Sequence, residues 1–575
     1  MNEASRYRYA PVLVIGALAV AAACAMFSLP QRSVSAMERK KAWWLGADLA
    51  PGGASTSPDS LGVRVTRVWS RSPARAAGLA GGDIILEING RPVSAPADVE
   101  VAFSAPGSPN QMELVFSRNG QRHVVPVILR EVPDFGLNIG VTLLLLAVVF
   151  ALLYLTSLDR VAVVGCGAVV SVLLGTGLGF YDQQSAFGAI RMSTLALLLG
   201  MGLITVALEE TGAFAIVARK VGELSRGDWS RLMVLLCVAT FFLSTFVNNL
   251  TTILVVLPLT LGLAREFRFD PKPFVIGEVI SSNLGGASSM IGDFPNMLIA
   301  SETSLQFHDF LLYMMPPCLV QLAVTIWFLQ RMRPHHTGER SGARLSAPES
   351  TAEVGVPALV PERMEQALAV MAAVVIAFFF CGRWGVPPAT VALAGGFTIL
   401  LMWNRAVPRL MGKAGFSDIL FFVGLFVLVG CAQASGILDV IAAWIVGLSR
   451  GSLLQLAIVL MWVAAITTTF LNAGPTTALF VPIVMGFGVP QTNGLLWWAL
   501  SLGVCAGSSA TITGATAGPV TLTKVEEFVK KMQTRTGSEP AAAMSFIDYA
   551  RVGVPLMVVF LLISSAYIWA LSVWF

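Results

Sequence analysis

The chain has 575 residues, of which 13% are charged and 55% are hydrophobic. Typical soluble domains have about 25% charged residues. This length would otherwise suggest roughly three or four soluble domains, but so few charged residues cannot cover their surfaces. We therefore expect most of the chain to lie in lipid. The net charge of +4 is small and widely spread, which argues against a nucleic acid partner.

The seven cysteines are odd in number, far apart and embedded in apolar runs. This pattern argues against a disulfide framework and against a metal site with closely spaced ligands. None of the four histidines lies in an H-E-x-x-H pattern. We therefore expect no metal and no cofactor, and we expect that the chain is not an enzyme.

Residues 10–30 form an apolar run that is long enough to cross a bilayer. Arg6 and Arg8 precede it, which predicts a cytoplasmic N-terminus. A cleaved signal peptide is the alternative, because Ala21, Ala22 and Ala23 are small residues of the kind found at cleavage sites. The run continues to Leu29, which favours an uncleaved anchor within residues 1–37. In both cases the next segment is exported.

Residues 38–132 have the composition of a soluble domain, with short β-type segments at 63–69, 84–88, 111–117 and 123–129. Asn89-Gly90 predicts a tight turn. The run SRSPARAAGLAGGDIILEINGRPV, residues 70–93, resembles a bacterial-type PDZ domain, a small α+β fold. The resemblance implies that a peptide or protein ligand binds the loop Trp44, Leu45, Gly46 and Ala47, with a helix near 97–104 as the other wall. The alternative is a PDZ domain that only packs against its own membrane region.

After Pro133, apolar segments follow in quick succession. Two long stretches, 230–264 and 456–489, are interrupted by Asn, Thr and Pro, and we interpret them as re-entrant hairpins. The basic loops then fall on one side, which the positive-inside rule assigns to the cytoplasm, whereas the PDZ domain and the nearly uncharged loops face outward. With the N-terminal anchor this gives about 11 spans of a bacterial inner membrane; the other spans are 136–156, 160–180, 193–212, 273–300, 308–330, 366–382, 388–404, 416–434, 495–523 and 546–572.

The two halves of the membrane region match in sequence. A shift of 224 positions pairs Gly212 with Gly436, Asn248 with Asn472, Thr252 with Thr476 and Pro258 with Pro482. A shift of 222 pairs Gly285 with Gly507, Ser289 with Thr511 and Gly292 with Gly514. The expected fold is thus a mostly α, polytopic, inverted-repeat transporter, with repeats at 133–330 and 366–575 joined by a basic cytoplasmic linker at 331–365.

Each hairpin tip is polar, FVNNLTT at 246–252 and FLNAGPTT at 470–477, and each following span is broken by small polar residues. Unpaired backbone survives in a bilayer only where it is buried in protein or lines a cavity. Carbonyl, hydroxyl and amide oxygens suit hard cations such as Na⁺. The alternative is helix packing through small residues.

The runs ALEETG (207–212), NNLTTILVVLPLTL (248–261) and GEVISSNLGGASSMIGDFPNMLIAS (277–301) resemble the arsenite permease and sodium–proton antiporter branch of the ion transporter superfamily, which also holds citrate carriers. The resemblance implies a homodimer with an elevator-like motion, and a substrate and ion site at the tips and broken helices. The implied residues are Asn248, Asn249, Thr251, Thr252, Asn283, Gly285, Gly286, Ser288, Ser289, Gly292, Asp293 and Asn296 in the first half, and Asn472, Thr476, Thr477, Ser508, Ser509 and Thr511 in the second.

This chain departs from the antiporter-like pattern of Asp-Asn at each tip, because it has Asn248-Asn249 and Asn472-Ala473. Direct Na⁺/H⁺ exchange is thereby less favoured than transport of an anion or an oxyacid. Among the remaining carboxylates, Glu278, Asp293 and Glu209 are the candidates for proton or ion coupling, because ionisable groups in spans are usually functional. Asp439 is expected to be solvated.

The leading hypothesis is a secondary active transporter for a small ion, coupled to Na⁺ or H⁺. A PDZ-containing regulator of membrane proteolysis and a transporter-like receptor without flux are the alternatives.

Overall fold

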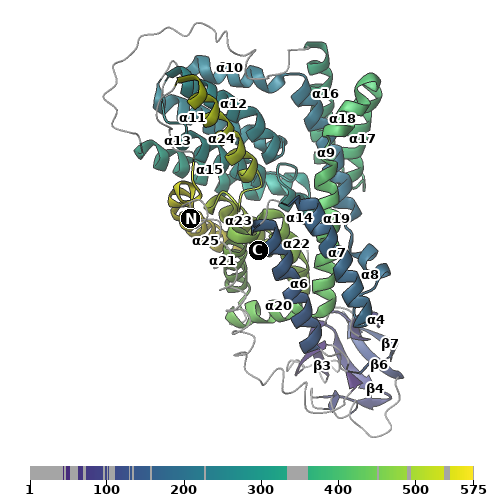
Figure 1. Cartoon of the computed structure of the whole chain (residues 1–575). Helices are drawn as coiled ribbons and strands as arrows, with labels where there is room; N and C mark the ends of the chain where they lie inside the picture. The colour runs from purple at the N-terminus through teal and green to yellow at the C-terminus, as the bar shows by residue number, and fades with distance from the viewer. Residues whose placement is uncertain are drawn as a thin grey trace. The chain divides into compact units, whose positions relative to one another are not determined.

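The structure is a computed structural model (Figure 1). It describes residues 43–44, 47–51, 62–68, 73–94, 98–99, 102, 111–118, 120–128, 130–131, 135–155, 158–225, 228–267, 269–332, 361–449, 452–487, 494–536 and 544–573. The expected anchor at 10–30 and most of the expected linker at 331–365 lie outside these residues.

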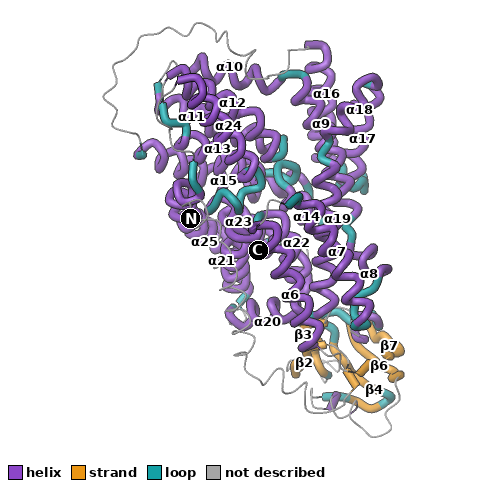
Figure 2. The backbone as a smooth tube through the Cα atoms, in the orientation of Figure 1, coloured by secondary structure: helices purple, strands orange, loops and turns teal. Residues whose placement is uncertain are grey.

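The segment that the sequence predicts to be a soluble domain folds mainly as an antiparallel sheet, which Figure 2 distinguishes from the helical remainder. The strands run in the order β2-β3-β4-β6-β7, with β5 paired to β4. Their bounds, with those of one short helix, are β1 (Trp43–Trp44), β2 (Ala47–Pro51), β3 (Val63–Val68), α4 (Pro73–Ala76), β4 (Ile84–Ile88), β5 (Arg91–Pro92), β6 (Gln111–Arg118), β7 (Gln121–Ile128) and β8 (Arg130–Glu131). The four β-type segments of the sequence are therefore confirmed to within two residues.

This domain has a hydrophobic core of its own, in which Val63, Ile85 and Leu114 are at most 1% exposed. The predicted turn is present, since Asn89 and Gly90 both have positive φ, at 50° and 73°. Arg118 donates two hydrogen bonds to the buried carboxylate of Asp83, at 2.8 and 2.7 Å. These bonds raise the pKa of the Arg118 guanidinium above its ordinary value.

The expected peptide loop is only partly described. Trp44 lies in β1 and pairs with Arg130, and Ala47 begins β2. Leu45 and Gly46 lie outside the described residues. Within the described sheet β2 pairs with β3 alone, so it is an edge of the kind to which a peptide strand adds.

The rest of the described chain is helical. The helices are α6 (Phe135–Leu155), α7 (Arg160–Gly177), α8 (Gln183–Ala189), α9 (Met192–Glu210), α10 (Ala213–Ser225), α11 (Trp229–Phe246), α12 (Asn249–Phe267), α13 (Lys272–Ala287), α14 (Phe294–Glu302), α15 (Phe307–Arg331), α16 (Pro361–Phe380), α17 (Pro388–Met402), η3 (Asn404–Ala406), α18 (Val407–Lys413), α19 (Phe416–Ser435), α20 (Ile437–Leu448), α21 (Leu453–Leu471), α22 (Ala473–Gly486), α23 (Leu495–Ala510), α24 (Gly518–Thr536) and α25 (Phe546–Ser572).

Among the described residues, nine helices are long and apolar enough to cross a membrane, or ten if the bent pair α17 and η3–α18 is one span. Seven of the nine lie on expected spans, and the other two, α11 and α21, are the first limbs of the expected hairpins. The expected spans 273–300 and 495–523 are both broken, because residues 288–293 and 511–517 are not helical. The hairpin tips are short, since only residues 247–248 separate α11 from α12 and only Asn472 separates α21 from α22.

The chain divides into two compact units that interleave along the sequence. Unit 1 contains Met1–Ile190, Val423–Gly447 and Val481–Pro490, and unit 2 contains Arg191–Phe422, Leu448–Phe480 and Gln491–Phe575. In unit 1, the buried Tyr181 hydroxyl donates to the Val427 carbonyl at 2.8 Å. Helices of the first repeat thus pack with α19 of the second, so the units do not coincide with the two repeats.

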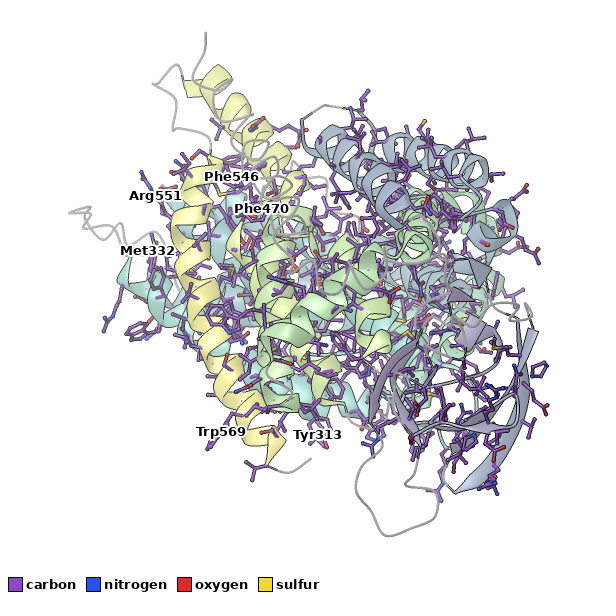
Figure 3. The ribbon with its side chains drawn as sticks, turned by 90° about the horizontal axis from the view of Figure 1, so that it is seen from below. Tyr313, Met332, Phe470, Phe546, Arg551 and Trp569 are labelled. Carbon is purple, nitrogen blue, oxygen red and sulfur yellow. The ribbon has the colours of Figure 1, made fainter. Side chains whose placement is uncertain are left out.

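In unit 2, helices α15 and α25 run antiparallel. Tyr567 donates to the Tyr313 carbonyl at 2.8 Å, and Gln321 donates to the Ser564 hydroxyl at 2.9 Å. Figure 3 shows Phe546 and Arg551 near one end of α25 and Trp569 near the other. The Arg331 end of α15 therefore lies beside the Arg551 end of α25.

Candidate functional site

The expected repeat appears in unit 2 as a repeated set of local contacts. In the first half, Ser289 donates to the Thr245 carbonyl at 2.5 Å and accepts the Gly292 N–H at 3.1 Å. In the second half, Thr511 donates to the Thr469 carbonyl at 2.8 Å and accepts the Gly514 N–H at 3.0 Å. Each hydroxyl therefore ties the break in one helix to the end of the preceding hairpin limb.

Two glycines make the same close approach in the two halves. A methyl group on Gly285 would overlap the Phe241 carbonyl, and one on Gly507 would overlap the Ala465 carbonyl. Phe241 and Ala465 are 224 positions apart, the shift that relates the two tips. The glycines thus let α13 pack on α11 and α23 pack on α21 in the same way.

The first tip places its amides in a buried polar network. Asn249 is 1% exposed, and its Oδ1 accepts from the Ser244 hydroxyl at 2.6 Å. Its Nδ2 faces Asn283 Oδ1 at 3.5 Å. The Ser244 and Ser282 hydroxyls are 3.1 Å apart. This network joins α11, α12 and α13 at the point where α11 ends.

Asp293 lies at the start of α14, where its carboxylate accepts the Phe294 N–H at 2.9 Å. Gly286 lies between Asn249 and Asp293, since a methyl group there would meet both side chains. Asn248 is half-buried and caps α12 by accepting the Thr251 N–H at 2.8 Å. The structure therefore brings Asn249, Asn283, Gly286 and Asp293 together, as expected.

At the second tip, one residue forms the turn between α21 and α22. Asn472 has a φ of 71°, a region that few non-glycine residues adopt. Its Nδ2 lies 3.3 Å from the Thr513 carbonyl and 3.4 Å from the Ala515 carbonyl. Asn472 thus holds the tip against the break between α23 and α24.

Near the broken helices, three polar contacts among the described residues join α13 and α14 of the first half to α23 of the second. Asn283 Nδ2 donates to the Ser508 carbonyl at 3.0 Å, and the Cys505 thiol lies 3.6 Å from the Asn283 carbonyl. Ser501 donates to Asn296 Oδ1 at 2.6 Å. Asn296 in turn donates to the carbonyls of Ala287 and Ser289, both at 2.8 Å.

Other expected site residues are buried but bond mainly to their own helices. Ser288 and Ser508 donate to carbonyls three residues earlier, and Thr477 and Ser509 to carbonyls four residues earlier. The hydroxyls of Thr252 and Thr476, which the repeat pairs, are both buried and lack a hydrogen-bond partner within the described structure. At these two matching positions, a bound ion or water molecule can supply the missing hydrogen-bond partner of the hydroxyl.

The carboxylates separate into three places. Asp293 belongs to the tip network, whereas Glu278 is fully buried between α12 and α13, where Thr260 donates to its Oε1. Its Oε2 has no hydrogen-bond partner within the described residues. Glu209 lies at the end of α9 beside Lys413, outside the tip network.

Two further acidic residues, Glu210 and Asp439, lie outside the tip network. Glu210, next to Glu209, pairs with Arg409 at 2.7 Å and with Lys413 at 3.0 Å, and its side chain is 8% exposed. The expectation that Asp439 is solvated was wrong, because it is 8% exposed in the first turn of α20. A short loop in the sequence does not indicate how closely the following helix packs.

Sequence reasoning missed Ser244, Ser282, Ser501 and Cys505, all of which contact predicted site residues. Cys505 has a signal in the repeat, because the shift of 222 pairs it with Asn283. The network described here contains amide, hydroxyl, thiol and carboxyl groups together with backbone carbonyls. Such a site can coordinate a hard cation directly or hold an oxyanion through amide and hydroxyl donors.

Comparison with known proteins gives two family matches. A family described as citrate transporter matches residues 131–503, and the PDZ domain family matches residues 51–129. The chain is 37% identical over 439 residues to the magnetosome protein MamN of Magnetospirillum gryphiswaldense, covering 75% of this chain and 99% of that protein. It is 29% identical over 420 residues to an uncharacterized transporter of Mycobacterium bovis, covering 71% and 92% of the two chains.

Among solved structures, the chain resembles the Alcanivorax borkumensis YdaH transporter at 14% identity and a TM-score of 0.45, over 76% of this chain and 97% of that one. The citrate transporter match alone spans well over half of the 575 residues. The chain therefore belongs to the citrate transporter family and carries a PDZ domain at its N-terminal side.

Proposed function

We propose that this chain is a secondary active transporter that moves a small inorganic oxyanion, a carboxylate or Na⁺ across the inner membrane. The movement is coupled to Na⁺ or H⁺ and proceeds by elevator-like alternating access, in a homodimer. Membership of the citrate transporter family supports transport as the activity. The substrate class, the coupling ion and the motion belong to the proposal.

One observation carries this proposal: unit 2 contains a buried polar half-site and a half-buried one, which the bond from Asn283 to the Ser508 carbonyl joins. Asn249, Asn283 and Asp293 line one side, and Asn472 and the α23–α24 break line the other. Buried amides and hydroxyls are costly unless they are hydrogen-bonded, and non-helical backbone survives at membrane depth only where it is buried in protein or lines a cavity. Their position in an inverted repeat is typical of secondary transporters.

Uptake into proteoliposomes tests the proposal. With imposed Na⁺ and pH gradients, we expect gradient-dependent uptake of at least one of citrate, succinate, sulfate, arsenite or Na⁺. Asn249→Ala should reduce that uptake about tenfold or more, because a lost hydrogen bond to an ion is worth about 1.5–3 kcal/mol. Asn404→Ala, at an exposed position in η3, is the matched control. The absence of gradient-dependent uptake of all five ions would exclude this proposal.

A receptor without flux is the second candidate. The observation that favours it is the absence of an acidic residue at both tips, Asn248-Asn249 and Asn472-Ala473. A receptor would bind an ion to the same site without moving it. Saturable binding together with no uptake in the same vesicles would therefore support the receptor.

The PDZ domain serves regulation or partner binding in this proposal, by accepting a peptide at the edge strand β2 on the extracytoplasmic side. Deletion of residues 38–131 should leave the transport rate within about twofold of the full chain while abolishing peptide binding, because the domain has its own core. Uptake by matched proteoliposomes measures the first effect, and peptide binding measures the second. A deleted protein that stays folded but transports nothing would make the PDZ domain part of the transport mechanism.

The bacterial inner membrane is the proposed location. The MamN relative is named as a magnetosome protein, so an internal membrane is the alternative location. Fractionation of cells that express the tagged chain distinguishes the two.

A further inference from the structure

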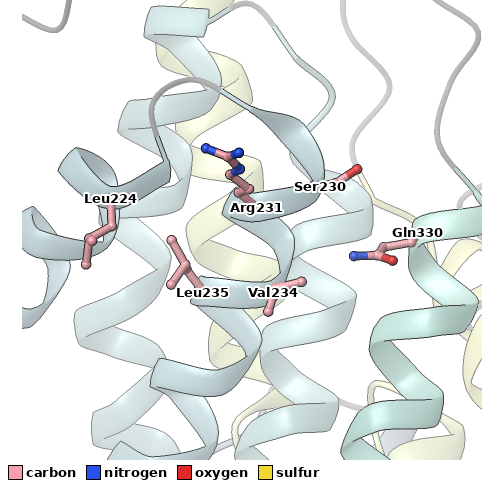
Figure 4. Close-up of a pocket in the computed structure, with 6 residues that line it drawn as sticks. All are labelled: Leu224, Ser230, Arg231, Val234, Leu235 and Gln330. Carbon is pink, nitrogen blue, oxygen red and sulfur yellow. The ribbon is translucent and has the colours of Figure 1, made fainter.

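A surface hollow of about 360 Å³ lies away from the tip network, between α10, α11 and α15 (Figure 4). Leu224 of α10, Val234 and Leu235 of α11 form its apolar wall. Ser230 and Arg231 of α11 and Gln330 of α15 are its polar residues. The hollow thus offers an apolar surface next to a group of hydrogen-bond donors.

Arg231 is exposed, and no carboxylate of the described residues forms an ion pair with its guanidinium. Asp228 is the nearest acid along the chain, but it caps α11 by accepting the Arg231 backbone N–H at 2.8 Å. The Arg231 guanidinium is suited to bind a phosphate group, and the Ser230 hydroxyl and the Gln330 amide that also line the hollow are further hydrogen-bond donors.

The hollow lies at the level of a membrane–water boundary. Gln330 precedes Arg331, whose guanidinium stacks on the half-exposed Trp327 ring at 4.0 Å, an arrangement typical of membrane interfaces. Arg551 lies at the same end of the paired helices α15 and α25. The hollow is therefore placed where lipid headgroups meet acyl chains, at the end that the charge pattern assigns to the cytoplasm.

We propose that this hollow binds an anionic phospholipid of the surrounding bilayer. The phosphate lies on Arg231, with Ser230 and Gln330 as further donors, and an acyl chain covers Leu224, Val234 and Leu235. Basic hollows between membrane helices on the cytoplasmic side suit such headgroups. The bound lipid would hold α10 against α11, the first limb of the first hairpin.

The linker that follows α15 is the other candidate occupant, because it begins two residues after Gln330. Its first part carries Arg333, Arg340 and Arg344 against Glu339. Those charges repel Arg231 rather than complement it. An anionic lipid therefore fits the charge of the hollow, and the part of the linker next to α15 does not; the later part carries Glu349 and Glu353, and deletion of residues 337–357 tests it.

Native mass spectrometry of the purified, delipidated full chain tests the proposal. Phosphatidylglycerol is titrated against phosphatidylcholine with the same acyl chains. We expect phosphatidylglycerol to bind preferentially, and Arg231→Gln to weaken that binding about fivefold, because one arginine near a membrane surface contributes about 1 kcal/mol. Arg231→Lys keeps the charge and should keep most of the preference. Arg551→Gln removes an exposed arginine of α25 at the same end and should have no effect.

Three results would overturn the proposal. The first is an unchanged phosphatidylglycerol preference in folded, monodisperse Arg231→Gln. The second is displacement of the lipid by glycerol 3-phosphate at equal concentration, which would identify a soluble phosphate site. The third is a gain of lipid binding after deletion of residues 337–357, which would show that the linker covers the hollow. If Arg231→Gln fails to fold, Leu235→Glu replaces it as the test variant and should abolish phosphatidylglycerol binding. Unchanged phosphatidylglycerol binding by Leu235→Glu would also overturn the proposal.

Discussion

Asn249 and Ala473 occupy matching positions in the two repeats, yet they give the tips different chemistry. In the first half, the Asn249 and Asn283 amides face each other at 3.5 Å. The matching residues of the second half are Ala473 and Cys505, a methyl group and a thiol. Hard cations prefer oxygen ligands, and at these two positions the first half has two amide oxygens whereas the second half has none.

The paired hydroxyls of Ser289 and Thr511 lead to a prediction for stability. Ser289→Ala removes the bond to Thr245 and leaves the Gly292 N–H unpaired. We expect a loss of about 1–3 kcal/mol in the free energy of unfolding, the cost of an unsatisfied buried polar group. Thr511→Val removes the matching bonds of the second half and should cost a similar amount.

Thermal unfolding in detergent measures both variants, with the exposed Ser304→Ala as the control. If the Ser289→Ala protein unfolded at the wild-type temperature, the hydrogen bonds of Ser289 would make no net contribution to the stability of the protein.

At the scale of elements, breaks rather than continuous helices form the site. In the first half, the helices after the tip and after the break begin with polar residues, Asn249 in α12 and Asp293 in front of α14, and both residues belong to the tip network. Pro258 lies within α12 and Pro482 within α22 at positions that the repeat pairs. A proline in a helix interior removes one backbone hydrogen bond, so both second limbs carry the same local weakness.

Helix α18 is held to α9 by an ion pair that the sequence did not reveal. Glu210→Gln removes the charge that binds Arg409 and Lys413. Both partners are largely exposed, so we expect the local stability of α18 to fall by about 1 kcal/mol. This corresponds to about fivefold faster amide exchange over residues 407–413.

Hydrogen exchange with mass spectrometry measures this effect. Glu209→Gln is the comparison, because Glu209 lies beside Lys413 but forms neither ion pair of Glu210, and it should change exchange in α18 less than Glu210→Gln does. Equal exchange in the wild-type and Glu210→Gln proteins would mean that α18 is held by its apolar contacts alone.

At the scale of the whole molecule, the orientation of the loops follows from charge. We expect single cysteines at Lys220, Lys413 and Lys524 to react with a membrane-impermeant maleimide only from the cytoplasmic side, because basic loops remain there. Cysteines at Gln184 and Arg383 should react from the outside. The measurement compares intact spheroplasts with inverted vesicles, in a background without the exposed Cys166.

Lys220 and Lys524 lie on either side of both hairpins, so their labelling tests whether the interrupted stretches return to the face from which they enter. Reaction of these two positions from opposite faces would mean that one interrupted stretch crosses the membrane completely. The re-entrant hairpins would then be excluded.

Several features were predicted because they depend on local composition. Hydropathy adds along a segment, and so the expected spans from 136 to 572 recover seven of the nine long apolar helices of the described chain. Turn chemistry is also local, since Asn89-Gly90 forms the predicted turn. The repeat predicted which breaks match, because the same backbone bend needs the same small residues in both halves.

Other features depended on which distant segments pack together. The bond from Asn283 to Ser508 joins residues 225 positions apart, and the pair of Ser501 with Asn296 joins residues 205 positions apart. The sequence by itself determined a membrane protein with two matched polar halves and a PDZ domain. Only the tertiary structure decided that Asp293 joins the tip network while Glu278 and Glu209 lie elsewhere, because side-chain partners are selected by the packing of whole helices.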